Sequence, residues 1–183
     1  PGAMPKASAM AASDQSAKRT HEDHLLVYQT GEGYQALLDA LTKTGIECRI
    51  YGARRGITED QREGNLVFRA FSEAGFVDDM ASARGVIAGG GFTTMGEAVY
   101  LRKPMLSVPL GLQFEQVMNA RYLELEGFGM MAENLDDPAT VPSFVARLDE
   151  YAKNLERYEQ DGNAVTFKAV DEFLDRAAVK GVL

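Results

Sequence analysis

Three successive glycines, Gly89 to Gly91, stand between an apolar run and a pair of hydroxyl side chains, Thr93 and Thr94. A run of glycines carries a high conformational-entropy cost, so it is typical of a backbone with positive φ or of a ligand held against the main chain. The two threonines stand where the N-cap of a helix is expected, and the free N–H groups of a helix N-terminus bind phosphate. The pattern predicts a phosphate-binding loop, and helix capping alone is the alternative.

An acidic side chain, Glu97, follows about one helical turn after the two threonines, in an otherwise apolar stretch. A carboxylate at this place stabilises the N-terminus of a helix. It is also suited to accept two hydrogen bonds from a vicinal diol such as that of a ribose. The residues alone leave both interpretations open.

A second glycine pattern, G-x-G-x-x-A, runs from Gly31 to Ala36 between an apolar run and a helical pattern. This pattern occurs in dinucleotide sites, where glycines let the backbone approach a phosphate. An NAD site also requires an acidic residue after the second strand, and the sequence has Arg54 and Arg55 there. We rank a phosphate-facing turn first, a plain tight turn second, and an NADP site that uses the two arginines third.

The elements that must position these loops alternate between strands and helices. The spacing of apolar residues predicts strands over 25–28, 46–51, 65–71, 85–88, 105–108 and 128–131, and helices over 34–43, 78–84, 93–102, 114–126, 141–159 and 163–178, with a charged loop over 54–63. Parallel strands need helical crossovers, so this order predicts an α/β fold: a Rossmann-like open, mainly parallel sheet with helices on both faces. Ligands bind at the carboxyl ends of the strands in such sheets, which points to the glycine loops.

Size and composition limit the classes of function. A chain of 183 residues has room for one domain with a proper core, and its net charge of −8 disfavours nucleic acid and anionic membranes as partners. The single cysteine, Cys48, excludes an internal disulfide and agrees with a reducing, cytoplasmic location. His21 and His24 are interpreted as tail residues, because no Cys or carboxylate cluster accompanies them at the spacing of metal ligands. No metal site is therefore expected.

An ordered series of short motifs lies between Phe76 and Ala120. It comprises Gly75-Phe76-Val77-Asp78-Asp79-Met80, Val86-Ile87, the three glycines, Glu97-Ala98, Lys103-Pro104, Val108-Pro109, Glu115-Gln116 and Asn119-Ala120. The series resembles the C-terminal, donor-binding domain of a GT-B-fold glycosyltransferase, of the kind that adds N-acetylglucosamine in peptidoglycan synthesis (glycosyltransferase family 28). It is more distantly similar to the signature stretch of the UDP-glycosyltransferases of plants and animals.

The resemblance implies a binding site for a UDP-sugar donor and assigns its parts. The base contacts the backbone of Val77 beside Phe76, although plain core packing is the alternative for this pair. The diphosphate lies on the second glycine loop and is closed in by the first, the ribose hydroxyls bind the helix carboxylate, and the sugar hydroxyls are read by three residues of a later helix. The implied donor-site residues are Thr30, Gly31, Phe76, Val77, Gly89, Gly90, Gly91, Phe92, Thr93, Thr94, Glu97, Glu115, Gln116 and Asn119.

The sequence departs from the family pattern at two of these positions. The signature histidine of the plant and animal enzymes falls at Gly89, so this side-chain donor to the diphosphate is absent. The first sugar-reading position is Glu115 rather than Gln or Asp, which leaves the donor sugar open. The spacing of Glu115, Gln116 and Asn119 lets all three gather near one helix edge, which supports the implied sugar site. Without the resemblance, they are interpreted as a solvated helix face.

The implied reaction is transfer of a glycosyl group from a UDP-sugar to an acceptor hydroxyl, with no cofactor. In the family, the acceptor site and general base lie in an N-terminal domain, so no catalytic residue is expected here and the chain alone is predicted to be inactive. Residues 24–183 are predicted to be the donor-binding domain, and residues 1–23 an unstructured leader or tag remnant. The expected partner is an acceptor-binding domain or a subunit that supplies it.

Three other functions stay open. They are a non-catalytic UDP-sugar-binding subunit, a UDP-sugar 2-epimerase, and an NADP-binding protein. An epimerase needs histidines around its cleft, which this chain does not offer.

The apolar C-terminal helix is expected either to form a homodimer or to pack on its own sheet. Asp78 and Asp79 are interpreted as a helix cap rather than as metal ligands.

Overall fold

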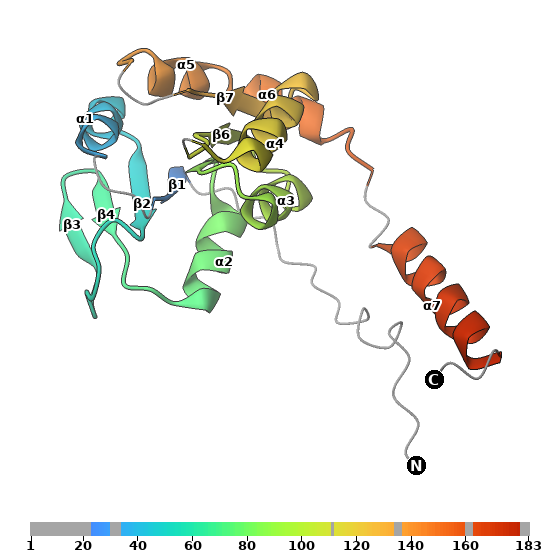
Figure 1. Cartoon of the computed structure of the whole chain (residues 1–183). Coiled ribbons are helices and arrows are strands. Elements are labelled where there is room, and N and C mark those ends of the chain that lie inside the picture. Colours follow the sequence, from blue (N-terminus) through green and yellow to red (C-terminus); the bar gives the residue numbers. More distant parts are fainter. Residues whose placement is uncertain (1–22, 30–33, 111, 134–136, 160–162, 180–183) are drawn as a thin grey trace. The chain divides into compact units, whose positions relative to one another are not determined.

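The computed structural model describes residues 23–29, 34–110, 112–133, 137–159 and 163–179 (Figure 1). The chain divides into two compact units. The first holds a sheet and the helices around it, and the second holds the helix α7 (Ala164–Val179). In chain order the first unit contains β1 (His24–Tyr28), α1 (Gln35–Thr44), β2 (Glu47–Tyr51), β3 (Gln61–Glu63), β4 (Leu66–Phe68), α2 (Glu73–Ser82), β5 (Gly85–Ala88), α3 (Phe92–Tyr100), β6 (Met105–Ser107), α4 (Phe114–Leu125), β7 (Gly129–Met131), α5 (Thr140–Ala146) and α6 (Leu148–Leu155).

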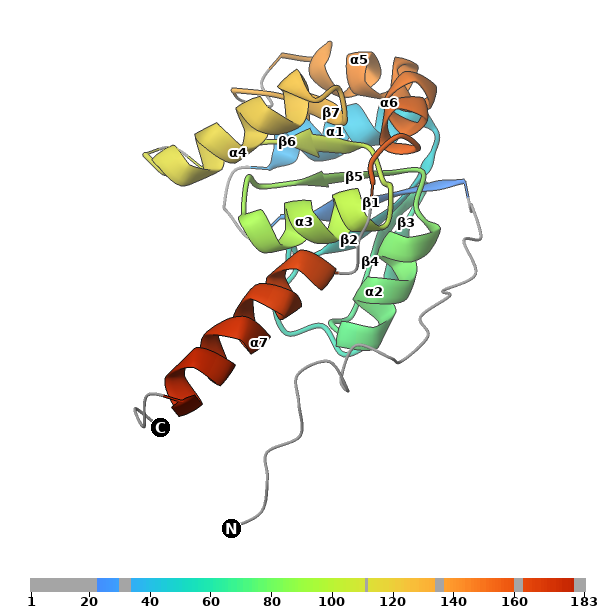
Figure 2. The same cartoon turned by 90° about the vertical axis from the view of Figure 1, so that its right-hand side faces the viewer.

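Within the described residues the strands form one seven-stranded sheet in the order β3-β4-β2-β1-β5-β6-β7. All neighbouring strands are parallel except β3 and β4, which are antiparallel. The helices α1 and α5 cover one face of the sheet, and α2 and α3 cover the other (Figure 2). Side chains of α1 and α5 belong to one apolar cluster, and those of α2 and α3 to a second. This confirms the predicted Rossmann-like α/β fold.

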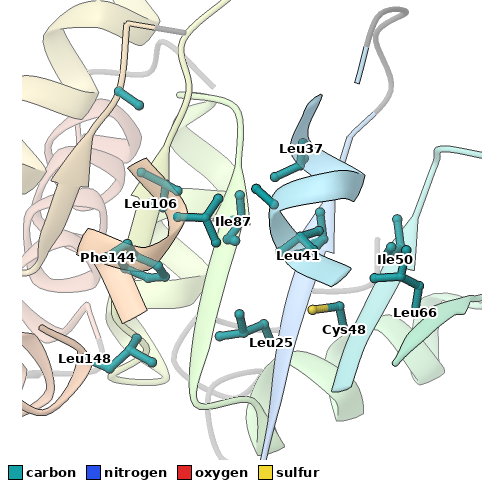
Figure 3. Close-up of a cluster of buried hydrophobic side chains, with 14 of the residues drawn as sticks. Leu25, Leu37, Leu41, Cys48, Ile50, Leu66, Ile87, Leu106, Phe144 and Leu148 are labelled. Carbon is teal, nitrogen blue, oxygen red and sulfur yellow. The ribbon is translucent and has the colours of Figure 1, made fainter. Parts of the chain in front are cut away.

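The core has two layers because alternate side chains of a strand point to opposite faces. Leu25 and Val27 of β1 pack with Leu41 of α1 in one cluster (Figure 3), whereas Leu26 packs with Met80 of α2 in the other. A strand that is buried on both faces shows a continuous apolar run in the sequence, and the run in β1 has this form. The predicted strand at this position is therefore confirmed.

The order of the strands reverses at β1, which pairs with β2 on one side and with β5 on the other. The chain first builds the sheet from β1 to β4 and then returns to place β5 beside β1. A reversal of this kind leaves a crevice at the carboxyl ends of the two central strands, where ligands bind in open α/β sheets. The loop that begins at Gly89 leaves β5 at this crevice.

Several predicted elements differ from the structure. Residues 61–63 form the edge strand β3 in the segment predicted as a loop, because the exposed Gln-Arg-Glu side chains carry no apolar signal while the backbone still pairs with β4. The predicted strand over 65–71 ends at Phe68. The predicted helix over 141–159 is interrupted, since α5 ends at Ala146 and α6 begins at Leu148.

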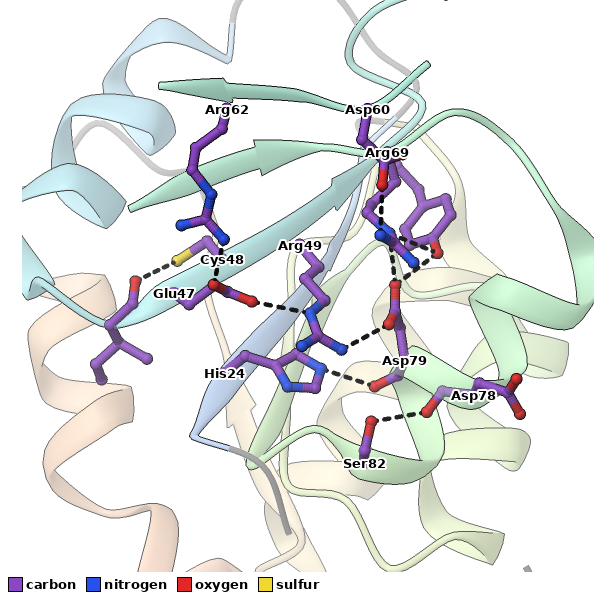
Figure 4. Close-up of polar contacts among 12 residues, drawn as sticks. His24, Glu47, Cys48, Arg49, Asp60, Arg62, Arg69, Asp78, Asp79 and Ser82 are labelled. Carbon is purple, nitrogen blue, oxygen red and sulfur yellow. Dashed lines mark hydrogen bonds and ion pairs between the residues drawn. The ribbon is translucent and has the colours of Figure 1, made fainter. Parts of the chain in front are cut away.

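The helix α2 begins five residues earlier than predicted. Ser72 is its N-cap, and the Oγ atom accepts a hydrogen bond from the backbone N–H of Gly75 at 3.2 Å. Asp78 and Asp79 therefore lie inside the helix, so their interpretation as a cap is wrong. Asp79 is buried instead, and its carboxylate lies among charged side chains of the sheet (Figure 4).

His24 is a core residue and not a tail residue, which corrects the prediction. It is the first residue of β1 and is only 1% exposed. Its Nε2 atom lies 2.9 Å from the carbonyl oxygen of Asp79 and donates a hydrogen bond to it. The side chain thus connects the start of β1 to the last turn of α2.

The described part of the second unit contains α7, which confirms the predicted helix over 163–178 to within one residue at each end. Apolar side chains recur at Val170, Phe173 and Leu174, the spacing of one helix face. That α7 forms a homodimer contact stays a prediction. Among the helices of the described ranges, none combines the length and the apolar character needed to cross a bilayer.

Candidate functional site

The glycine loop after β5 and the start of α4 lie against each other at the carboxyl end of the sheet. The backbone N–H of Gly90 donates to Gln116 Oε1 at 3.2 Å, and Asn119 Nδ2 donates to the carbonyl oxygen of Gly90 at 3.0 Å. Gln116 Oε1 also accepts from the backbone N–H of Leu110, in the loop after β6, at 3.0 Å. Residues that the sequence placed in one donor site are therefore in direct contact.

Gly90 is a glycine because the backbone of α4 approaches it closely. A Cβ atom built on Gly90 would lie 2.5 Å from the carbonyl oxygen of Gln116. Gly91 is different, since a Cβ there meets no described atom within 4 Å. Of the two explanations for a glycine run, positive φ does not apply to this loop, because the described glycines with positive φ lie elsewhere and Gly91 has φ −64°.

The N-terminus of α3 is open. The helix begins at Phe92 with Gly91 as its N-cap, and no side chain of the described residues caps it. Thr93 and Thr94 lie in the first turn, so the prediction that they stand at the N-cap is wrong. The first N–H groups of a helix have no intrahelical acceptor, and here the bond from Met95 N to Gly91 O, at 3.1 Å, is the first of the helix. An anion at this end meets N–H donors and the positive end of the helix dipole.

Glu97 stands one turn further along α3. Its side chain is exposed, and among the described residues the carboxylate has no hydrogen-bond or ion-pair partner. Thr93 and Thr94 precede it by four and three residues, so all three lie on one side of the helix. Both carboxylate oxygens are thus available to a ligand that reaches beyond the helix N-terminus.

Phe76 and Val77 have different environments in α2. The ring of Phe76 packs edge-on against Tyr28, with 5.4 Å between centroids, and against Tyr51, with 5.1 Å. Val77 is 48% exposed. As Val77 lies in the second turn of α2, its N–H takes part in the helical hydrogen-bond ladder. In this conformation a base at this position would contact the side chain of Val77 rather than a free N–H.

Glu115 and Gln113 have different environments at the start of α4. Glu115, in the first turn of α4, is exposed and without a hydrogen-bond or ion-pair partner among the described residues. Thr30 and Gly31 lie outside the described residues. Sequence reasoning missed Gln113, whose Oε1 accepts from Gln116 Nε2 at 2.6 Å. The position of Gln113 directly before a helical pattern could have indicated this residue, but Gln113 belongs to no recognised motif.

Of the two arginines of the NADP alternative, Arg54 has a structural role at the edge of the sheet, whereas Arg55 is exposed. Arg54 donates to Gln61 Oε1 at 2.6 Å and to Glu63 Oε1 at 2.5 Å, and its guanidinium lies 3.6 Å from the ring centroid of Phe68. These contacts hold β3 and favour the basic loop as a structural feature. Within the described ranges no group of three or more His, Cys, Asp or Glu side chains is placed to hold a metal ion.

The chain matches the model of the family described as glycosyl transferase family 1 over residues 8–149. Two curated relatives are UDP-N-acetylglucosamine–N-acetylmuramyl-(pentapeptide) pyrophosphoryl-undecaprenol N-acetylglucosamine transferases. The one from Bacillus thuringiensis is 32% identical over 114 residues, which are 60% of this chain and 31% of the relative. The one from Bacillus cereus is 30% identical over 105 residues, which are 55% of this chain and 28% of the relative. The match therefore spans less than a third of the length of these relatives.

Solved structures share the fold at low sequence identity. A glycosyltransferase of kitacinnamycin has a TM-score of 0.67 at 16% identity, covering 85% of this chain and 43% of its own. The glycosyltransferase SnogD from Streptomyces nogalater has a TM-score of 0.63 at 16% identity, with coverages of 97% and 46%. The spinosyn rhamnosyltransferase SpnG has a TM-score of 0.58 at 22% identity, with coverages of 86% and 43%.

Proposed function

The chain belongs to glycosyl transferase family 1, and on this premise we propose that it binds the nucleotide-sugar donor of a glycosyl transfer. One observation carries the proposal. The uncapped N-terminus of α3 opens at the carboxyl end of β5, and the unpaired carboxylate of Glu97 stands one turn beyond it. A nucleoside diphosphate has the matching groups, because its phosphates are anionic and its ribose carries a diol.

The proposed binding mode follows from the chemistry of these groups. The diphosphate accepts hydrogen bonds from the N–H groups of Gly91 to Thr94, and the ribose hydroxyls donate to Glu97. The same N–H groups stabilise the charge that develops on the diphosphate as the glycosyl bond breaks. Gly89 stands where the plant and animal enzymes carry their signature histidine, so in this proposal the helix N-terminus supplies the stabilisation through its backbone donors.

We propose UDP as the nucleotide. The printed names of both curated relatives contain UDP-N-acetylglucosamine. Two structural neighbours, the spinosyn rhamnosyltransferase SpnG and the glycosyltransferase VinC, are described in complex with thymidine diphosphate and dTDP. All of these are pyrimidine nucleoside diphosphates, and a carboxylate that accepts from both ribose hydroxyls favours the ribonucleotide.

The acceptor hydroxyl and its general base are proposed to be supplied by another domain or by a partner subunit. The chain covers 43% and 46% of the first two structural neighbours, which leaves more than half of each without a counterpart in the match. We therefore expect these 183 residues to bind a UDP-sugar without transferring its sugar. Steady glycosyl transfer by this chain alone would contradict this division.

Calorimetric titration of the chain with UDP, UDP-N-acetylglucosamine and NADPH tests the proposal. We expect saturable binding of UDP and of the UDP-sugar, and no heat of binding with NADPH. Binding of NADPH in the absence of any UDP signal would replace the proposal by the dinucleotide alternative. A chain that binds none of the three would leave only its fold and family.

A further inference from the structure

A cavity with a volume of about 300 Å³ lies at the amino ends of neighbouring strands, and it is called the amino-edge cavity below. Of the residues that line it, Asp23 directly precedes β1, Arg84 directly precedes β5, and Lys103 comes two residues before β6. These strands are adjacent and parallel, so the residues before them meet at one edge of the sheet. The glycine loop after β5 leaves the opposite edge, so the cavity is separate from the proposed donor site.

Three cationic side chains line the amino-edge cavity, those of Arg84, Arg102 and Lys103. Lys103 is only 1% exposed, and a lysine is rarely buried to this extent. A charge in the protein interior is screened less than a charge in water. The ammonium of Lys103 therefore contributes a positive potential to the cavity even without direct contact to a ligand.

Two carboxylates, those of Asp23 and Asp149, line the same cavity, so three cations against two carboxylates leave one positive charge on the lining. Asp23 is engaged with Arg84, at 2.8 Å between Oδ1 and Nη1, and 81% of its side chain is exposed. Asp149 is exposed as well. Because water screens both carboxylates and the buried charge of Lys103 is positive, the potential of the cavity favours an anion.

The helix α6 adds to this potential. It begins at Leu148, which lines the cavity, and the N-terminus of a helix carries a partial positive charge. Arg102 binds the other end of the same helix, since its Nη1 donates to the carbonyl oxygen of Glu156 at 3.0 Å. The Nε–H of Arg102 is buried and has no acceptor among the described residues, so this arginine retains an unused donor.

From these charges we propose that the amino-edge cavity binds an oxyanion, namely the phosphate or carboxylate group of a small ligand. The volume of the cavity lies at the lower end of the range of roughly 300–1,000 Å³ that is typical of small-molecule sites. The cavity is thus a second ligand site, and its occupation does not depend on the proposed donor site.

The helix α3 separates the two sites. Its N-terminus lies at the glycine loop, and Arg102 directly follows its C-cap, Leu101. A helix of nine residues is about 14 Å long, so a small anion contacts one end of α3 or the other. Different backbone amides therefore report on the two sites.

Titration of the native chain with sodium phosphate or sodium acetate tests the proposal, with amide NMR signals as the readout and sodium chloride holding the ionic strength constant. We expect saturable shifts at Arg84, Lys103 and Asp149 with at least one of the two anions. Saturation with phosphate alone assigns the cavity to a phosphate group, and saturation with acetate alone assigns it to a carboxylate. Absence of saturable shifts at these amides with both anions would overturn the proposal.

The same titration distinguishes this proposal from the proposed function, because phosphate is also expected at the N-terminus of α3. Saturable shifts confined to Thr93 and Thr94 would support the donor site and overturn the amino-edge cavity. Saturable shifts at the cavity amides in a chain that does not bind UDP would contradict the proposed function alone.

Two substitutions of opposite sign extend the test. Arg84→Gln removes a partly exposed cation and should raise the dissociation constant of the bound anion about tenfold, whereas Asp149→Asn removes a carboxylate and should lower it about threefold. Lys43→Gln is the matched control, because Lys43 is exposed on α1 and does not line the cavity. It should change the dissociation constant by less than about twofold. Equal effects of Arg84→Gln and Lys43→Gln, or weaker binding in Asp149→Asn, would overturn the proposal.

Discussion

Asp79 of α2 and Arg49 of β2 form an ion pair with 2.7 Å between Oδ1 and Nη1, and only 5% of the Asp79 side chain is exposed. The other carboxylate oxygen accepts from the hydroxyl of Tyr51 at 2.6 Å and lies 2.9 Å from Nε of Arg69 (Figure 4). One buried carboxylate thus joins α2 to β2 and to Arg69, the residue directly after β4. The helix that it anchors carries Phe76 and Val77.

Replacement of Asp79 by Ala is expected to destabilise the fold by about 3 kcal/mol, because it leaves two arginines and a buried hydroxyl without their shared acceptor. The neighbouring Asp78 offers a matched control, since its side chain is exposed. Asp78→Ala should change the stability by less than about 0.5 kcal/mol. Urea denaturation of both variants measures the difference, and similar midpoints would show that the buried ion pair contributes little.

Stability is expected to fall at high pH because of two buried groups. Burial, followed by the hydrogen bond to Asp79, raises the pKa of Tyr51 from 10.0 to about 12, and burial raises the pKa of Cys48 from 9.0 to about 12. The folded chain therefore holds protons that the unfolded chain releases above pH 9 to 10. Their contribution to stability is fully present below that range and is lost as the pH rises to about 12.

Denaturation midpoints measured at pH 8, 10 and 11 test this dependence. Replacement of Cys48 by Ala should make the decline less steep, because one of the two groups is removed. A midpoint that stays constant from pH 8 to pH 11 would contradict the raised pKa values.

The two neighbouring glycines of the loop are expected to respond differently to alanine. In Gly90→Ala the new Cβ would lie 2.5 Å from the carbonyl oxygen of Gln116, so we expect a loss of about 1–3 kcal/mol in unfolding free energy. In Gly91→Ala the Cβ meets no described atom within 4 Å and φ is −64°, so the change should stay within about 1 kcal/mol.

Gly91→Ala, the variant expected to keep its stability, is expected to lose affinity for UDP. A methyl group at Gly91 stands where the diphosphate is proposed to approach, so Gly91→Ala should bind UDP at least about tenfold more weakly while remaining folded. Native affinity in that variant would place the phosphates elsewhere.

The ribose contact of Glu97 is tested with UDP and 2′-deoxy-UDP. Glu97→Ala is expected to raise the dissociation constant for UDP by about tenfold to a hundredfold. This change corresponds to the loss of a charged hydrogen bond worth about 1.5–3 kcal/mol. The native chain should prefer UDP to the deoxynucleotide, and Glu97→Ala should lose that preference. The fold should be unaffected, because no described residue depends on this carboxylate. If the preference survives, Glu97 acts only as a charge near the helix N-terminus.

The sequence by itself determined the α/β architecture and the position of the glycine loop. Its apolar runs and helical patterns have the periods of strands and helices, and these periods depend on residues that are close along the chain. The strand over 85–88 and the helix that follows it were predictable for this reason. The family resemblance depended on the same local order of motifs.

Only the tertiary structure decided what the individual side chains do. Gly90 and Gln116 are 26 residues apart, and Asp79 and Arg49 are 30 apart, so no local period relates them. Gln116 accepts from the backbone of Gly90, and Asp79 pairs with Arg49, because packing of α4 and α2 on the sheet brought each side chain to a specific partner. A hydrogen bond is formed at a distance of about 3 Å, and that distance is set by how the elements pack and not by the order of residues within them.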